Sequence, residues 1–163
     1  MGRAGALHRA PNDGKARRFR QTPANTFDPR FSPDGRLIAY ASDESGQPEI
    51  YVAPLDGATQ PRRLSRAGGF SPRWRGDGGE LYFLQADGTL MAVNPRAEVA
   101  TPVQLFRIDG VSAADRYSPP RERNVVFDVM PDGQRFLLRL PDTSDLRGDD
   151  LRVMVNWAAA RRD

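Results

Sequence analysis

The 163-residue chain has no cysteine, one histidine and no apolar run near the roughly 20 residues of a membrane span. The lack of cysteine excludes disulfides, thiolate metal sites and cysteine nucleophiles. The single histidine, His8, lies in a polar N-terminal segment, so we expect neither a Ser-His-Asp triad nor an imidazole zinc site. A P-loop, a dinucleotide-binding fingerprint and a nucleophile elbow are also missing. We therefore predict that the chain is not an enzyme and uses no cofactor or metal.

Lysine is nearly absent as well, so the net charge of +3 is carried almost entirely by arginine. Acidic and basic residues alternate over most of the chain, as they do on an ordinary solvated surface. The sequence has no basic stripe with interleaved aromatic residues, which would indicate nucleic-acid binding. The N-terminus has no apolar stretch of the kind found in signal peptides. We expect no nucleic-acid or membrane partner. The expected location is cytoplasmic for the chain as given, and periplasmic or extracellular if it is the tail of a longer exported protein.

Glycine and proline, by contrast, are frequent, with 15 and 14 residues. They fall between apolar runs, and seven Asp-Gly pairs mark the same places, which is typical of many tight turns. The clearest case is Ser32-Pro33-Asp34-Gly35, which stands between two apolar runs and predicts a hairpin. The pattern returns at Asp77-Gly78, 43 residues later, and at Asp132-Gly133, 55 residues after that. A period near 40–45 residues with several short strands per unit indicates propeller blades.

The first copy of this pattern continues into Gly46-x-x-Glu49-Ile50-Tyr51-Val52. Together the two segments resemble the WD40-like (PD40) repeat of TolB-type β-propellers, a likeness that covers about residues 16 to 158. The second copy lacks Ser-Pro, and the third reads Met130-Pro131-Asp132-Gly133. The ending at residues 151–157 also resembles the terminus of propellers attached to bacterial Ser/Thr protein kinases.

These patterns predict an all-β protein, a partial β-propeller of about three four-stranded antiparallel blades. We expect a disordered basic N-terminus at residues 1–15, the partial propeller at 16–158 and a tail at 159–163. The expected blades span about 27–66, 70–108 and 124–157, and the last is incomplete because the sequence offers no outer strand for it.

A few acidic and aromatic residues could take part in binding or catalysis. The aspartates of the repeated turns, Asp34, Asp77 and Asp132, are expected to accept hydrogen bonds within their own turns, with Ca²⁺ binding as the alternative. Trp74 is expected to pack between blades, with a place at the mouth of a ligand-binding channel as the alternative. Acidic pairs at 43–44 and 149–150 lie in expected loops, so we interpret them as solvated rather than catalytic.

The long connector at residues 109–123 carries the one candidate contact site. Its aromatic residue Tyr117 is flanked by Arg116, Arg121 and Arg123, a composition that suits a partner-binding hot spot. The alternative is that Tyr117 folds back onto the neighbouring blade.

The sequence is compatible with three functions. The first is a non-enzymatic module that binds a protein or peptide. The second is the C-terminal sensor or regulatory propeller of a larger enzyme, either a Ser/Thr kinase or a prolyl-oligopeptidase-type peptidase. The third is a small hydrolase or lyase built on a propeller.

The two ends of the chain raise the question of ring closure. We predict that residues 17–20 form the missing outer strand beside residues 151–157, since an unpaired edge is an aggregation hazard. Within one chain this would close only three blades, fewer than the usual four. A homodimer that exchanges these strands would instead make a six-bladed ring. The competing arrangement is an open three-blade arc, with residues 16 to 21 on the first blade or unattached.

Overall fold

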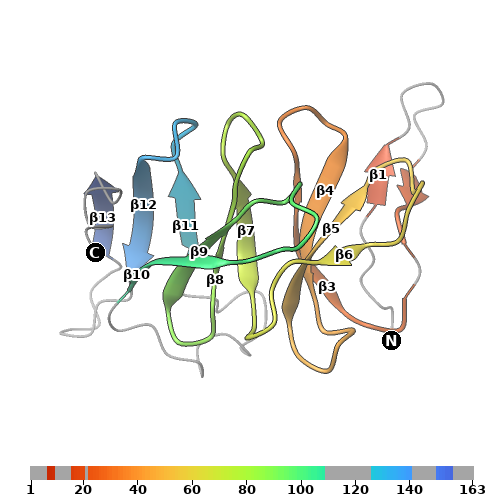
Figure 1. Cartoon of the computed structure of the whole chain (residues 1–163), viewed down its shortest axis with the longest axis horizontal. Helices are drawn as coiled ribbons and strands as arrows, with labels where there is room; N and C mark the ends of the chain where they lie inside the picture. The colour runs from red at the N-terminus through yellow and green to blue at the C-terminus, as the bar shows by residue number, and fades with distance from the viewer. Residues whose placement is uncertain (1–6, 10–15, 21, 109–125, 141–149, 156–163) are drawn as a thin grey trace.

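The computed structural model describes residues 7–9, 16–20, 22–108, 126–140 and 150–155. In these ranges every regular element is a β-strand, and the strands form a hairpin and three larger sheets (Figure 1). The sheets stand side by side in chain order, with the hairpin at one end of the row and the third sheet at the other. Among these residues there is no helix, and hence none long and apolar enough to cross a membrane.

Each of the three larger sheets is a meander of consecutive antiparallel strands. The first blade consists of β3 (Thr26–Phe31), β4 (Leu37–Ser42), β5 (Glu49–Pro54) and β6 (Arg62–Arg63). The second consists of β7 (Phe70–Trp74), β8 (Leu81–Leu84), β9 (Thr89–Val93) and β10 (Val103–Arg107). The third consists of β11 (Val126–Val129), β12 (Arg135–Leu140) and β13 (Asp150–Val155). The partial propeller predicted from the sequence is therefore the observed architecture.

The turn between the first two strands has the same geometry in all three blades. In the first blade, Ser32 N donates to Leu37 O and Gly35 N donates to Ser32 O, both at 2.9 Å. The first of these bonds recurs in the other blades, where Arg75 N donates to Glu80 O and Met130 N donates to Arg135 O. The glycine at the fourth turn position has a left-handed φ angle in every blade, 67° at Gly35, 69° at Gly78 and 72° at Gly133. The aspartate before each glycine accepts the amide N–H two residues further on, as predicted.

Apolar side chains fill the two spaces between neighbouring blades. Between the first and second blades, Ala39, Ile50 and Val52 pack with Phe83 and Met91 in one cluster, against which Trp74 also packs. Trp74 therefore has the inter-blade role predicted for it. The second cluster includes Tyr82, Leu84, Leu90, Phe127, Phe136 and Leu138. Strands β4 and β8 are buried on both faces because each lies between two packed layers.

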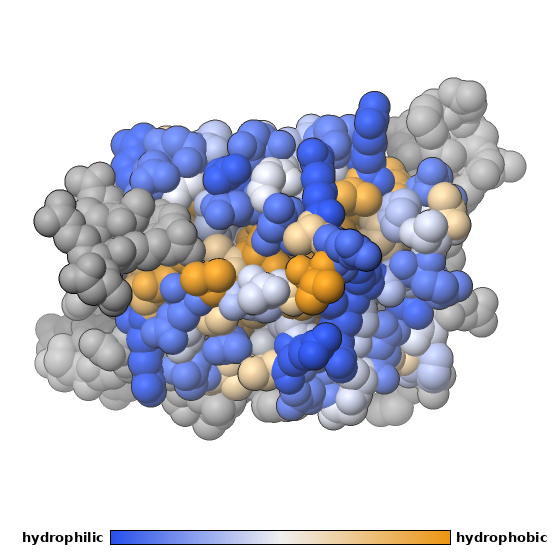
Figure 2. All heavy atoms as spheres, in the orientation of Figure 1, coloured by the Kyte–Doolittle hydropathy of each residue, from blue (hydrophilic) through white to orange (hydrophobic). Residues whose placement is uncertain are grey.

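The outer strands face solvent. Figure 2 shows mainly hydrophilic side chains on the face viewed, with a short apolar band across the middle, where β10 lies. Val103 of β10 and Val99 just before it are both exposed. Arg62 of β6 extends toward the second blade and donates hydrogen bonds to the carbonyl oxygens of Pro95 and Ala97.

The N-terminal segment departs from the expected closure. Strand β1 (Leu7–Arg9) lies within the stretch expected to be disordered, and it pairs antiparallel with β2 (Ala16–Arg18). Strand β13 pairs with β12. The prediction that residues 17–20 pair with residues 151–157 is therefore wrong within a single chain. Pairing with a strand a few residues away closes a much shorter loop, so it costs less conformational entropy than pairing across the whole chain.

Candidate binding surface

The first strands of the three blades, β3, β7 and β11, lie next to one another. In a propeller such inner strands line the central axis. Each carries a charged residue two positions before the first turn residue: Arg30, Arg73 and Asp128. We call these three residues, together with Asp28 and Ser71, the axial surface.

A backbone irregularity shapes two of these strands in the same way. Asp28 and Ser71 hold corresponding positions, and both have positive φ angles, 49° and 50°. The register shifts beside each of them, between Phe27 and Arg30 in β3 and between Phe70 and Arg73 in β7. A bulge of this kind bends a strand and redirects its side chains. The bulges bring Ser71 Oγ within 3.5 Å of Asp28 Oδ2.

Arg73 is largely enclosed, with a side chain only 13% exposed. Its guanidinium lies 5.5 Å from the ring centroid of Phe127, and its Nε is 3.8 Å from Asp128 Oδ1. Burial lowers the pKa of Arg73, and the nearby positive charge of Arg30 lowers it further. The guanidinium nevertheless stays protonated at neutral pH.

Arg30 occupies the same position one blade earlier but is exposed to solvent. The two arginines make the same local contact, because each donates from Nη1 to the carbonyl oxygen of the preceding proline. The main chain of β3 is also tied to the next blade, since Trp74 Nε1 donates to Arg30 O at 3.1 Å. The surface thus presents fixed positive and negative groups beside an aromatic ring, which suits the amides and carboxylates of a peptide.

The carboxylates of the turns are occupied by local partners. Asp77 accepts a two-point hydrogen bond from Arg75, at 2.7 and 2.9 Å, and also accepts the N–H of Gly79. Arg75 Nη1 also donates to Glu80, which accepts the hydroxyl of Tyr82. Burial raises the pKa of Tyr82, and its bond to Glu80 adds to the shift. Across the described part of the chain, no group of three metal-binding side chains forms.

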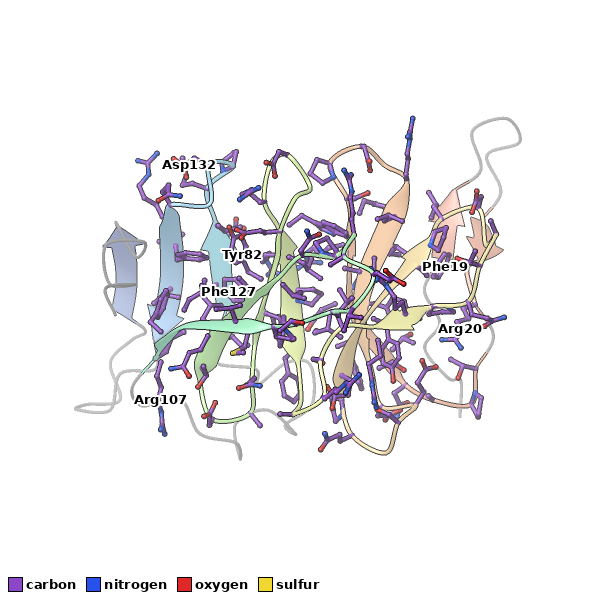
Figure 3. All side chains as sticks on the ribbon, in the orientation of Figure 1. Phe19, Arg20, Tyr82, Arg107, Phe127 and Asp132 are labelled. Carbon is purple, nitrogen blue, oxygen red and sulfur yellow. The ribbon has the colours of Figure 1, made fainter. Side chains whose placement is uncertain are left out.

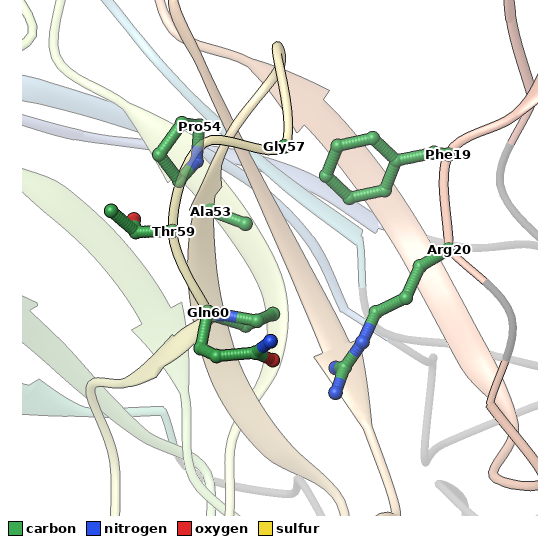
Figure 4. Close-up of a pocket in the computed structure, with 8 residues that line it drawn as sticks. Phe19, Arg20, Ala53, Pro54, Gly57, Thr59 and Gln60 are labelled. Atoms are coloured by element: carbon green, nitrogen blue, oxygen red, sulfur yellow. The ribbon is translucent and has the colours of Figure 1, made fainter.

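A pocket of about 330 Å³ lies between the N-terminal segment and the edge of the first blade (Figure 4). Phe19 and Arg20 form one wall, and Ala53, Thr59 and Gln60 contribute to the other. Figure 3 shows that Phe19 and Arg20 lie far from Asp132 and Phe127, at the opposite end of the molecule. None of the residues that line the pocket belongs to the axial surface.

The candidate residues from the sequence have different outcomes. Tyr117, Arg116, Arg121 and Arg123 lie outside the described residues, so their role stays a prediction. Of the first acidic pair, Asp43 accepts hydrogen bonds from Asn25 and Glu44 pairs with Arg20.

The charged residues of the axial surface were not singled out from the sequence. A signal was present in the similar segments Phe27-Asp28-Pro29-Arg30 and Phe70-Ser71-Pro72-Arg73.

Comparison with known proteins gave short sequence matches and long structural ones. No protein-family model matches the chain. It is 49% identical over 41 residues to the Tol-Pal system protein TolB of Bordetella pertussis, covering 25% of this chain and 9% of that protein. It is 44% identical over 63 residues to the putative tricorn protease homolog 2 of Streptomyces coelicolor, covering 37% of this chain and 5% of that protein. The chain thus spans less than a tenth of the curated relatives it matches.

Among solved structures, TolB from Acinetobacter baumannii superposes with a TM-score of 0.68 at 17% identity, over 94% of this chain and 36% of that one. Enzymes share the same architecture. An oligogalacturonate lyase in complex with manganese has a TM-score of 0.57 at 11% identity, over 84% of this chain and 36% of that one.

The meander sheets, the repeated inner turns and these superpositions define the chain as a β-propeller protein, here an open arc of blades. More specifically, its fold is similar to that of the TolB propellers, as the turn motifs indicated.

Proposed function

We propose that this chain is a non-enzymatic binding module that holds a segment of another protein, or a peptide, on its axial surface. One observation carries the proposal. Arg73 is enclosed between Asp128 and the ring of Phe127, while the equivalent Arg30 of the neighbouring blade is exposed to solvent. A largely enclosed, oriented arginine beside an accessible one provides one fixed and one free positive group for binding a carboxylate.

The fold supports this proposal in a general way. Propellers present loops and inner strands on a rigid disc, and binding sites are commonly built on such scaffolds. The similarity to TolB, a protein whose name places it in the Tol-Pal system, fits a protein partner. The tyrosine and arginines of the connector at 109–123 are proposed as a second contact for the same partner.

A display library of random 12-residue peptides would test the proposal. We expect peptides with acidic residues to be enriched on the wild-type chain and lost on Arg30→Glu. The matched control is Arg66→Glu, an exposed arginine outside the axial surface, which should keep the enrichment. Equal enrichment on Arg30→Glu, or none on the wild type, would overturn the assignment.

The enzyme-associated alternative has its own support. The short matches include tricorn protease homologs, and a structure of prolyl endopeptidases superposes with a TM-score of 0.58 at 15% identity, over 94% of this chain and 26% of that one. In that case the axial surface would guide peptide substrates toward a catalytic domain in the same polypeptide. Sequencing the complete reading frame from source DNA tests this idea, because the alternative requires a kinase or peptidase domain in it.

The association of two copies into a six-bladed ring is a separate proposal. It concerns the two end faces of the arc rather than the axial surface.

A further inference from the structure

The face of the first blade that is turned away from the second blade is built like a face that packs against a neighbouring blade. We aligned the first and second blades by their inner turns and strand register. Five residues on this face then match five residues on the face by which the second blade contacts the first. The matched pairs are Phe31 with Trp74, Ile38 with Leu81, Tyr40 with Phe83, Tyr51 with Met91, and Ala53 with Val93. We call this set on the first blade the leading face. Its composition is that of an inter-blade surface rather than of a solvated one.

The N-terminal segment packs on the leading face, of which every residue except Phe31 is at most 5% exposed. The ring of Phe19 contacts Tyr40 edge-on at 6.3 Å, and Arg20 Nη1 donates to Tyr40 Oη at 3.1 Å and to Glu44 at 2.7 Å. Phe31 differs from its counterpart. It is 55% exposed, whereas Trp74 is held in the inter-blade cluster. The cover is therefore incomplete where the leading face approaches the axis.

The opposite end of the arc exposes apolar side chains as well. On the third blade, Leu137 is 42% exposed and Met130 is 44% exposed, although the residues that match Leu137 in the other blades, Ala39 and Tyr82, are fully buried. Asp128 is beside them, and the three residues with Val129 and Arg135 line a pocket of about 270 Å³. Val129 packs against the cluster between the second and third blades, and we call the other four residues the trailing face.

Charge makes the two faces complementary. Within the chain, Arg73 of the second blade is next to Asp128 of the third. The side chain of Asp128 is still 72% exposed. Arg30, Arg73 and Asp128 hold equivalent positions on the inner strands of the three blades. If the leading face of another copy packs against the trailing face, the Arg30 of that copy comes next to Asp128. Each Asp128 would then lie between two arginines, and the like-charged neighbours Arg30 and Arg73 would gain an opposite charge.

We propose that two copies of this chain associate through these faces, trailing face to leading face, and close a six-bladed ring. Two arcs of three blades give a number within the usual range of four to eight. The two contacts are identical by two-fold symmetry, and together they complete the axial surface around its axis. The proposal does not depend on which peptide that surface binds.

The N-terminal segment competes with this association. Phe19 and Arg20 occupy the place where the trailing face of the second copy would pack. The segment must leave before the ring closes, and its strand β2 then becomes available to pair with β13 of the second copy. Weakening the attachment of the segment should therefore strengthen the dimer.

A charge-exchange experiment tests the contact directly, using sedimentation velocity over a range of concentrations. Each of the single variants Arg30→Asp and Asp128→Arg should weaken dimerisation by about tenfold or more, because each places like charges at both contacts. An equimolar mixture of the two variants should recover it, since both contacts then join opposite charges. The charge control Arg66→Asp should dimerise like the wild type.

The attachment of the N-terminal segment is tested in parallel. The double variant Phe19→Ala, Arg20→Ala should dimerise about tenfold more tightly than the wild type if the segment competes. If both proteins stay monomeric, or if the mixture of charge variants does not recover association, the ring is overturned. Leu137→Asp separates this proposal from the proposed function, because it should abolish the dimer while peptide enrichment through Arg30 persists.

Discussion

The amide nitrogen of Gly76 donates a hydrogen bond to the carbonyl oxygen of Pro131, at 3.0 Å. This bond joins the inner turns of the second and third blades, which are 55 residues apart. A Cβ added to Gly76 would lie 2.7 Å from Pro131 Cβ and 2.9 Å from Pro131 O. At this turn position the first and third blades have proline, Pro33 and Pro131. The second blade has glycine because Pro131 occupies the space that a side chain at position 76 would need.

We predict that Gly76→Ala destabilises the protein by about 1–3 kcal/mol, the usual cost of forcing extra atoms into a packed contact. The measurement is urea unfolding followed by tryptophan fluorescence. A variant as stable as the wild type would show that the turns of the two blades are not in contact.

The turn glycines provide a second prediction, based on a comparison between two positions. Gly35 and Gly133 both have left-handed φ angles, so alanine at either should cost about 1 kcal/mol. Nothing is near a Cβ at position 35, but at position 133 it would overlap the hydroxyl of Tyr82. Gly133→Ala should therefore lower the melting temperature more than Gly35→Ala. Adding Tyr82→Phe should recover part of the difference, and equal losses at the two positions would contradict the packing of the turn on Tyr82.

Asp77 makes stability depend on pH in the acid range. Its hydrogen bonds from Arg75, and then that from Gly79 N, lower its pKa from 3.8 to about 2. Because the folded pKa is depressed, the stabilisation is complete above pH 3.8 and is lost as pH falls through about 2. The melting temperatures of wild type and Asp77→Asn should thus differ at neutral pH and converge in strong acid. A difference that persists at the lowest pH would rule out the charge as its source.

Glu49 is a buried carboxylate whose partners are all neutral. It accepts hydrogen bonds from Ser65 Oγ, from Gln47 Nε2 at 2.7 Å and from Gly68 N at 3.2 Å. These bonds fix the chain where it passes from the first blade to the second. Glu49→Ala should cost about 2 kcal/mol or more, because it leaves buried donors without an acceptor. The exposed Glu98→Ala is the matched control, and similar unfolding midpoints for both variants would contradict this role.

Local signals in the sequence predicted much of the fold. The Asp-Gly turns and their period require only residues close in sequence, so the three blades and the packing of Trp74 were predictable. The axial surface was not, because Arg30, Arg73 and Asp128 come together only after three strands separated by 43 and 55 residues pack side by side.

At the N-terminus the sequence argument predicted a long-range contact where a local one forms. A general argument about open edges favoured a long-range partner for residues 17–20, whereas the chain forms a hairpin with β1, nearby in sequence. The aromatic ring of Phe19 then packs on Tyr40 of the first blade. One of the arrangements considered from the sequence, residues 16 to 21 on the first blade, matches this contact.

The meander order of every sheet has a consequence for how the chain reaches its native state. Each strand pairs with the strand just before or after it, so every pairing within a sheet joins elements that are neighbours in the sequence. Proteins with such local pairing fold faster than sandwiches and closed barrels of similar size. Strand pairing within a blade can therefore begin early, but a blade becomes stable only when its neighbour covers its apolar face.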